Sequence, residues 1–217
     1  MRINTFMINR IVSNNFFKDS KLVNELFAHK FSNVNTALDF KTTADLNWMN
    51  AQRPWLDAID LGVEHLEQIE QDYKCNREDL VDVWIKRNID IWNLEDHTNY
   101  HRENADIHKD YFEGFSKVIN LQVYVSKDIP PEAGTCFWEY TGSDLLSDTL
   151  DGKGEVAKWP FDNWKIVEQI PFEPNLAFTY NAGPDGVFHS APPTEMLLES
   201  QVPSHTREVI IIRFRYK

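Results

Sequence analysis

The sequence contains few of the features that mark disulfide-stabilised or membrane-spanning proteins. It has two cysteines, Cys75 and Cys136, in 217 residues. Two cysteines without metal-site spacing do not form a disulfide framework and fit a reducing compartment. No stretch approaches the ~20 consecutive apolar residues that cross a bilayer, and the N-terminal segment lacks the apolar run of a signal peptide. We therefore expect a soluble, cytoplasmic protein without a membrane partner.

Positive charge is also scarce. The chain carries 22 Lys and Arg against 34 Asp and Glu, which gives a formal net charge of −12. An acidic protein repels phosphate backbones, so duplex nucleic acid is not an expected partner unless one face is locally basic. The main concentration of positive charge lies at the C-terminal end, in Arg207, Arg213, Arg215 and Lys217. We expect Arg213 and Arg215, which lie nearest the terminus, to be exposed.

Glycine and proline are unevenly placed: six of the eight Gly lie between 134 and 186, and nine of the ten Pro lie at 130 or beyond. Because these residues mark turns between strands, residues 1–87 are expected to form a mainly helical support region and residues 88–217 a β-rich core of one domain. Apolar residues at helical spacing predict helices over 19–30, 56–73 and 78–86.

The periodicity changes to two from about residue 88. In 118–126, Ile119 and Leu121 share one face, whereas Asn120, Gln122 and Tyr124 share the other, which suits the lining of a small cavity. Further strands are expected at 134–140, 166–172, 175–182 and 206–216. The segment 141–165 reads as an insertion of the kind that often forms a lid. The pattern predicts an α+β fold with a β-sandwich or barrel buttressed by N-terminal helices.

Three histidines are followed two residues later by an acid, as in a metal-binding strand. About one such pair is expected by chance from the composition. His65 and Glu67 lie in an expected helix, where a two-residue step points side chains apart. His101 and Glu103 lie in a polar run and remain a weaker rival. His108 and Asp110 precede the alternating strand, and His189 follows another expected strand, so the three could share one face of an iron or manganese ion.

Arg207 lies at the head of the apolar strand EVIIIRFRY, eighteen residues beyond His189. A buried guanidinium needs an anionic partner, which either a ligand or an Asp or Glu of the protein itself could provide. Tyr124, on the polar face of its strand, could donate a second hydrogen bond to the same anion.

These motifs, taken in order, resemble those of the iron(II)- and 2-oxoglutarate-dependent oxygenases, particularly the prolyl-hydroxylase-like branch. The matching segments are His-Lys-Asp at 108–110, the strand with Tyr124 sixteen residues after His108, GTCFWEY at 134–140, the stretch around His189, and TREVIIIRFRY with Arg207. The resemblance covers about 88–217. It implies a double-stranded β-helix (jelly roll), iron ligation by His108, Asp110 and His189, and binding of the distal carboxylate of 2-oxoglutarate by Arg207 and Tyr124.

The resemblance also implies an activity. It is hydroxylation of a substrate by iron(II) and dioxygen, coupled to decarboxylation of 2-oxoglutarate to succinate. Peptidyl proline and a small molecule such as an amino acid are both open as substrates, because a fold does not fix the substrate. Selectivity is expected in 93–107 and in the lid candidate with Trp159, Phe161 and Trp164, and Trp48 and Trp55 could border the mouth.

Two other interpretations stay open. The chain could be a cupin-like protein that binds a metal or ligand without oxygenase activity. It could also be a zinc hydrolase using His97, His101 and Glu103, although that set requires a helix and its segment has weak helical periodicity.

Overall fold

Ten β-strands in two antiparallel sheets dominate the computed structural model, which describes residues 9–19, 21–22, 38–39, 53–96, 98–99, 107–110, 112–143 and 162–217. The strands are β1 Asn9–Ser13, β2 Leu38–Asp39, β3 Leu80–Asn93, β4 Thr98–Asn99, β5 Lys117–Tyr124, β6 Thr135–Tyr140, β7 Trp164–Ile170, β8 Ala177–Asn181, β9 Phe188–Ser190 and β10 His205–Tyr216. The α-helices are α3 Arg53–Val63, α4 Leu66–Tyr73 and α7 Thr194–Glu199, and short 3-10 helices span Arg77–Asp79 and Pro131–Ala133.

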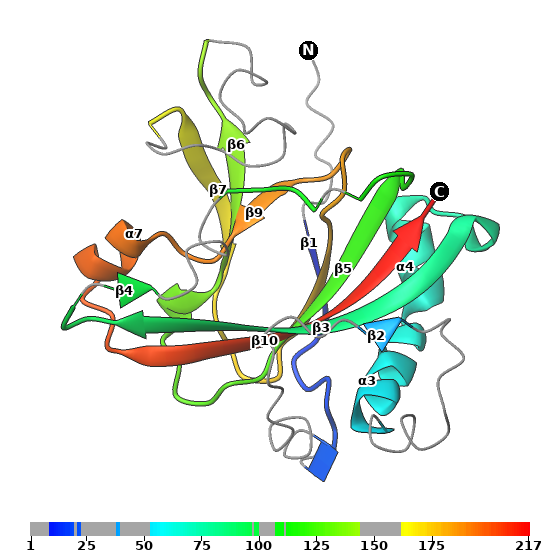
Figure 1. Ribbon diagram of the computed structural model, residues 1–217, viewed down its shortest axis with the longest axis horizontal. Coiled ribbons are helices and arrows are strands. Elements are labelled where there is room, and N and C mark those ends of the chain that lie inside the picture. The colour runs from blue at the N-terminus through cyan, green and yellow to red at the C-terminus, as the bar shows by residue number, and fades with distance from the viewer. Residues whose placement is uncertain are drawn as a thin grey trace.

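The strand order is that of a jelly roll. The larger sheet runs β1-β8-β5-β10-β3-β2, with β4 paired to β3, and the smaller sheet runs β7-β6-β9. From β5 onward the chain passes back and forth between the two sheets, and an isolated bridge between His108 and His189 extends the smaller sheet beyond β9. Figure 1 shows the long strands β3, β5 and β10 side by side, with β6, β7 and β9 as a separate layer. This order confirms the expected double-stranded β-helix.

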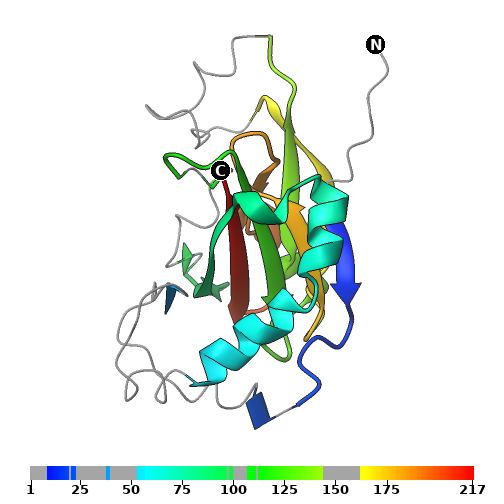
Figure 2. The same cartoon turned by 90° about the vertical axis from the view of Figure 1, so that its right-hand side faces the viewer.

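The outer face of the larger sheet is apolar and is covered by α3 and α4. Ala58 and Ile59 of α3, and Leu66 and Ile69 of α4, are buried in one cluster with side chains of β3, β5 and β10. Figure 2 shows the two helices lying across this face. The helical buttress is therefore confirmed, although the expected helix over 56–73 is divided by a turn at Glu64 and His65.

The helix expected over 78–86 is wrong, because β3 begins at Leu80. Val83 and Ile85 of this strand are buried under the helices, whereas Asp82 and Lys86 alternate with them and face the interior between the sheets. Because both faces of this strand are buried, the alternation of apolar and polar residues did not separate a buried face from an exposed one, and the sequence did not indicate a strand. The first 87 residues thus include β1, β2 and the start of β3 beside the helices.

The inner face of the larger sheet is mixed. Phe178 and Tyr180 of β8, with Val209 and Ile211 of β10, form an apolar cluster between the sheets. Alternate positions of β3, β5 and β10 bring charged and amide side chains into the same interior. The polar face of β5 is buried as expected, with Asn120 fully buried. These side chains form the candidate site.

No helix among the described residues is long and apolar enough to cross a membrane. Of the helix expected over 19–30, Lys21 and Leu22 are helical, and 23–30 lies outside the described residues.

Candidate metal centre

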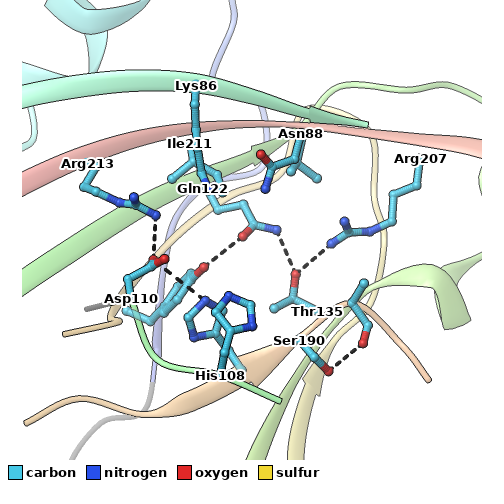
Figure 3. Close-up of a pocket in the computed structure, with 14 residues that line it drawn as sticks. Lys86, Asn88, His108, Asp110, Gln122, Thr135, Ser190, Arg207, Ile211 and Arg213 are labelled. Carbon is cyan, nitrogen blue, oxygen red and sulfur yellow. Dashed lines mark hydrogen bonds and ion pairs between the residues drawn. The ribbon is translucent and has the colours of Figure 1, made fainter. Parts of the chain in front are cut away.

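His108, Asp110 and His189 converge at one end of the interior. The segment before β5 runs antiparallel to β9, and reciprocal backbone hydrogen bonds of 3.1 and 2.9 Å join His108 to His189. The rings of the two histidines lie 4.4 Å apart, and one ligand atom from each of the three residues lies within 4.8 Å of the others. Figure 3 shows His108 and Asp110 side by side at the cavity. The structure therefore brings together the three residues that the sequence singles out as metal ligands.

His189 presents an unprotonated nitrogen to this cluster. Its Nδ1 lies 3.3 Å from the carbonyl oxygen of Val187, which can only accept a hydrogen bond, so Nδ1 carries the proton. The lone pair is then on Nε2, which faces Asp110 at 3.9 Å. Burial, together with the nearby His108, lowers the pKa of His189 to about 3. The imidazole is thus neutral and able to ligate a metal at neutral pH.

Asp110 is held by two donors on one oxygen. Its Oδ2 accepts hydrogen bonds from Arg213 Nη2 at 2.6 Å and from Asn120 Nδ2 at 2.8 Å. Burial alone would raise the pKa of Asp110, but the charges of Arg213 and Lys86 outweigh it and lower the pKa. The carboxylate is therefore ionised. Two imidazoles and one carboxylate are a donor set that suits iron(II) or manganese(II) with open positions, so the residues present fit such an ion.

A small polar cavity of about 30 Å³ lies beside this cluster. Its lining comes from both sheets and includes Lys86, Asn88, His108, Asp110, Gln122, Thr135, Tyr180, His189, Ser190, Arg207 and Arg213. The Lys86 side chain forms no hydrogen bond with another described residue. Burial is the main cause that lowers the pKa of Lys86 to about 8, and the charge of Arg213 is the second. Three cationic side chains and one carboxylate line the cavity, so its wall carries excess positive charge.

Arg207 lies on the cavity wall but already has an internal anionic partner. Its Nη1 donates to Asp90 Oδ2 at 2.6 Å, its Nε to the carbonyl oxygen of Ala133 at 2.7 Å, and its Nη2 to Thr135 Oγ1 at 3.0 Å. The side chain is buried. Of the two partners considered from the sequence, the structure supplies the protein carboxylate. These three bonds use three of the five N–H groups of the guanidinium.

Tyr124 lies behind the cavity wall. Its hydroxyl accepts a hydrogen bond from the Thr135 backbone N–H at 2.7 Å and donates to the Ile170 carbonyl oxygen, 2.9 Å away. The ring is fully buried, 5.7 Å from the Arg207 guanidinium, and is not part of the lining. In its place, Gln122 and Tyr180 present polar atoms to the cavity.

A continuous chain of hydrogen bonds joins the two ends of the interior. Asn120 Nδ2 donates to Tyr180 Oη at 3.2 Å, Tyr180 Oη to Gln122 Oε1 at 3.1 Å, and Gln122 Nε2 to Thr135 Oγ1 at 2.7 Å. Thr135 also accepts from Arg207. Figure 3 shows the part of this chain from Gln122 through Thr135 to Arg207. Buried polar groups arranged in this way are satisfied and fixed in place.

The sequence predicts that Arg213 and Arg215 are exposed, and this prediction is wrong. Both residues are buried, with exposed fractions of 5% and 7%. Arg213 bonds Asp110, and both Nε and Nη2 of Arg215 donate to the carboxylate of Asp82. The strand β10 continues to Tyr216 between β3 and β5, so its last residues are covered on both edges and are buried. The shared parity of Arg207, Arg213 and Arg215 was the available signal that all three face the interior.

Several other candidates receive less support or lie outside the described part of the chain. Glu67 is exposed on α4, and His65 lies at the turn before it. The residues His97, His101, Glu103, Trp48, Trp159, Phe161 and the side chain of Trp55 lie outside the described residues. Trp164, the remaining lid candidate, is buried at the start of β7.

No protein-family model and no curated protein matches the chain. Among solved structures, it is similar to a prolyl-4-hydroxylase from Pseudomonas putida, at 14% identity and a TM-score of 0.47 over 97% of this chain and 86% of that one. It is also similar to a viral collagen prolyl hydroxylase from Paramecium Bursaria Chlorella virus-1 in complex with 2OG, at 11% identity and a TM-score of 0.45, covering 97% and 96%. A third is iron-bound HygX from Streptomyces hygroscopicus, at 11% identity and a TM-score of 0.43, covering 98% and 83%.

With identities of 14% or less and TM-scores below 0.5, these are similarities in the path of the chain, and the fold is established by the strand order itself. Two of these three structures are prolyl hydroxylases.

Proposed function

We propose that this protein is a non-haem iron(II)- and 2-oxoglutarate-dependent oxygenase that hydroxylates its substrate. The observation that carries the proposal is the convergence of His108, Asp110 and His189, with ligand atoms within 4.8 Å, beside a positively charged interior cavity. The two imidazoles and the carboxylate would hold the iron. When bound, iron(II) with 2-oxoglutarate and dioxygen supplies oxidation of a C–H bond to an alcohol, with release of succinate and carbon dioxide.

The protein's own residues would fix the geometry and keep the site dry. The backbone bridge between His108 and His189 holds the two imidazoles side by side, and the Asp110 backbone N–H donates to the Ala182 carbonyl oxygen at 2.7 Å. Val209 and Ile211 form the apolar part of the cavity wall. Such walls exclude water, which strengthens electrostatic interactions within the site.

The charge of the cavity suits a dicarboxylate cosubstrate, whereas its volume requires a rearrangement. A cavity of about 30 Å³ has room for a water molecule or two, not for a five-carbon dicarboxylate. The Lys86 side chain lines the cavity and forms no hydrogen bond with a described residue. It can therefore move aside without breaking a hydrogen bond within the described part of the chain. Arg207, with two N–H groups not used in its three bonds, would receive the distal carboxylate as the sequence motifs imply.

The substrate would approach beside the smaller sheet. An apolar cluster that includes Trp138, Trp164 and Phe188 lies next to the candidate ligands, and Trp138 Nε1 donates to Ser190 Oγ at 2.9 Å. Aromatic walls suit either a peptidyl proline ring or a small apolar amino acid. Both substrate classes therefore remain part of the proposal.

The test is succinate production from 2-oxoglutarate by protein reconstituted with iron(II), measured by NMR, with added candidate peptides and amino acids. We expect iron-dependent turnover in the wild type and its loss in His108→Ala, Asp110→Ala and His189→Ala. Exposed Glu139→Ala serves as the matched control. Turnover that survives the loss of any of the three ligands would contradict the proposal.

A cupin-like protein that binds a metal or ligand without oxygenase activity is the second candidate. The engagement of Arg207 by Asp90 and the small cavity favour it. The melting temperature separates the two, because a ligand that binds only the folded state stabilises it by mass action. The oxygenase is expected to show a further rise when 2-oxoglutarate is added to protein with Mn²⁺. Stoichiometric zinc with no such rise would identify the second candidate.

A further inference from the structure

Three buried arginines lie on the inner face of β10, and one of them departs from the pattern of the other two. Arg207 lies opposite Asp90 in the register with β3, and Arg215 lies opposite Asp82. Each forms an ion pair with that cross-strand neighbour. Arg213 lies opposite Trp84, and it reaches past the sheet to Asp110, in the segment that carries two candidate metal ligands.

Arg213 acts on Asp110 together with its neighbour on β5. Asn120 lies opposite Arg213 in the register between β5 and β10, and its Oδ1 accepts a hydrogen bond from Arg213 Nε at 2.9 Å. Both residues then donate to the same carboxylate oxygen, Asp110 Oδ2, at 2.6 and 2.8 Å. The three polar groups form a closed triangle of hydrogen bonds.

The triangle selects which carboxylate oxygen faces a metal. A carboxylate oxygen has two lone pairs, and the hydrogen bonds from Arg213 and Asn120 occupy both on Oδ2. Among the residues that the structure describes, every hydrogen bond to the Asp110 side chain reaches Oδ2. Oδ2 also lies 3.9 Å from His189 Nε2, and Oδ1 is the oxygen whose lone pairs no hydrogen bond from a described residue uses.

Arg213 and Asn120 are themselves fixed. Arg213 is 5% exposed, with the Phe112 ring 4.9 Å from its guanidinium carbon, and Asn120 is fully buried. Asn120 also donates to Tyr180 Oη. A carboxylate held by immobile donors loses little further rotational freedom when it binds an ion.

We propose that Arg213 is a positioning residue for the metal centre, which with Asn120 clamps Asp110 through Oδ2 so that Asp110 binds a divalent cation through Oδ1 alone. The proposal rests on the proposed function only in that His108, Asp110 and His189 bind a metal. It also has an electrostatic consequence: Arg213 balances the charge of Asp110, so a bound divalent ion keeps its two positive charges and attracts an anionic co-ligand.

The test is the Mn²⁺ affinity of Arg213→Met, measured from the EPR signal of free Mn²⁺. Arg215→Met is the matched control. Both variants remove a buried arginine from the same face of β10, but Arg215 bonds Asp82 and makes no hydrogen bond to Asp110. Removal of a positive charge would by itself strengthen the binding of a cation. Weaker Mn²⁺ binding in Arg213→Met would therefore show that the Asp110 carboxylate has lost its orientation. We expect Mn²⁺ binding to weaken about 10- to 100-fold in Arg213→Met and to stay near the wild-type value in Arg215→Met.

Two further variants make the result decisive. Asn120→Ala removes one hydrogen bond to Oδ2 without removing a charge, so it replaces Arg213→Met if that variant does not fold, and we expect a smaller loss of affinity. Unchanged or tighter Mn²⁺ binding in both Arg213→Met and Asn120→Ala would overturn the inference. His108→Ala tests the underlying site. If this variant binds Mn²⁺ as the wild type does, the proposed function fails. If His108→Ala loses Mn²⁺ binding while Arg213→Met and Asn120→Ala keep it, only the positioning role is refuted.

Discussion

The two ends of the interior contain the same ion pair in different settings. At one end Arg207 pairs with Asp90, and at the other Arg213 pairs with Asp110, each at 2.6 Å and with both partners largely buried. Asp90 is supplied by the strand next to β10, so the first pair follows from sheet register alone. Asp110 is supplied by a segment that also carries His108 and that pairs with His189 of β9. The same two side-chain types thus serve the sheet at one end and a candidate metal centre at the other.

The largest expected effect on stability is at the Arg207 end. Asp90→Ala leaves the Arg207 guanidinium buried without its carboxylate, and we expect the free energy of unfolding to fall by about 3–5 kcal/mol, as for other broken buried ion pairs. Urea denaturation measures this. The double variant Asp90→Leu with Arg207→Met removes both charges and is expected to recover most of the loss.

The same Asp90→Ala variant sharpens the comparison with the other end. Since Asp90 pairs with Arg207 and not with the Asp110 carboxylate, which is held by Arg213, Mn²⁺ affinity should remain within about twofold of the wild type once allowance is made for unfolded protein. A loss of Mn²⁺ binding in folded Asp90→Ala would show that the two ends are not separable.

A second change at the Arg207 end is steric. A Cβ added at Gly134 would lie 1.9 Å from the Ile170 carbonyl oxygen, which is part of the backbone and cannot move aside cheaply. Gly134 follows Ala133, whose carbonyl oxygen accepts a hydrogen bond from Arg207. We expect Gly134→Ala to lower the free energy of unfolding by about 1–3 kcal/mol, as other overpacked sites do. Exposed Glu139→Ala, on the strand β6 that begins directly after Gly134, should change it by less than about 0.5 kcal/mol.

The smallest expected effect is the response to alkaline pH. Burial raises the pKa of Cys136 to about 12, and the pKa of Tyr124 likewise to about 12, with the Arg207 charge opposing both shifts. These pKa values exceed those of the unfolded chain, so their contribution to stability is full below pH 9 and is lost as pH rises toward 12. We expect Cys136 and Tyr124 together to lower the free energy of unfolding by ~1–2 kcal/mol between pH 8 and 10, whereas Lys86, with its pKa lowered to about 8, acts in the opposite direction over this range.

The control for this prediction is Cys136→Ala, which removes the thiol and should leave a shallower fall over the same pH range. A pH dependence of stability between pH 8 and 10 that is the same in Cys136→Ala as in the wild type would contradict the assignment of the effect to this end of the interior.

The sequence predicted those parts of the site that depend on one strand or on the order of motifs. The alternation in 118–126 indicated that Asn120, Gln122 and Tyr124 share a face that lines a cavity; the structure buries all three, and Gln122 is the one that lines the cavity. The order of His108, Asp110 and His189 indicated a shared site, and the jelly-roll topology brings them together.

The parts that the sequence did not predict depend on contacts between segments. Nothing in the pattern of β10 shows that Asp82 and Asp110, 133 and 103 residues away, neutralise Arg215 and Arg213. Without those partners, a basic segment near the terminus is expected to be exposed. The helix expected over 78–86 was wrong for the same reason, because Asp82 and Lys86 are polar residues on a buried strand face.

The central claim is that His108, Asp110 and His189 bind one divalent metal ion, and anomalous diffraction from crystals grown with Mn²⁺ tests it most directly. We predict a single strong peak within coordinating distance of His189 Nε2, one Asp110 oxygen and a His108 ring nitrogen. No peak among these atoms at millimolar Mn²⁺, or a peak bound by other residues only, would contradict the account.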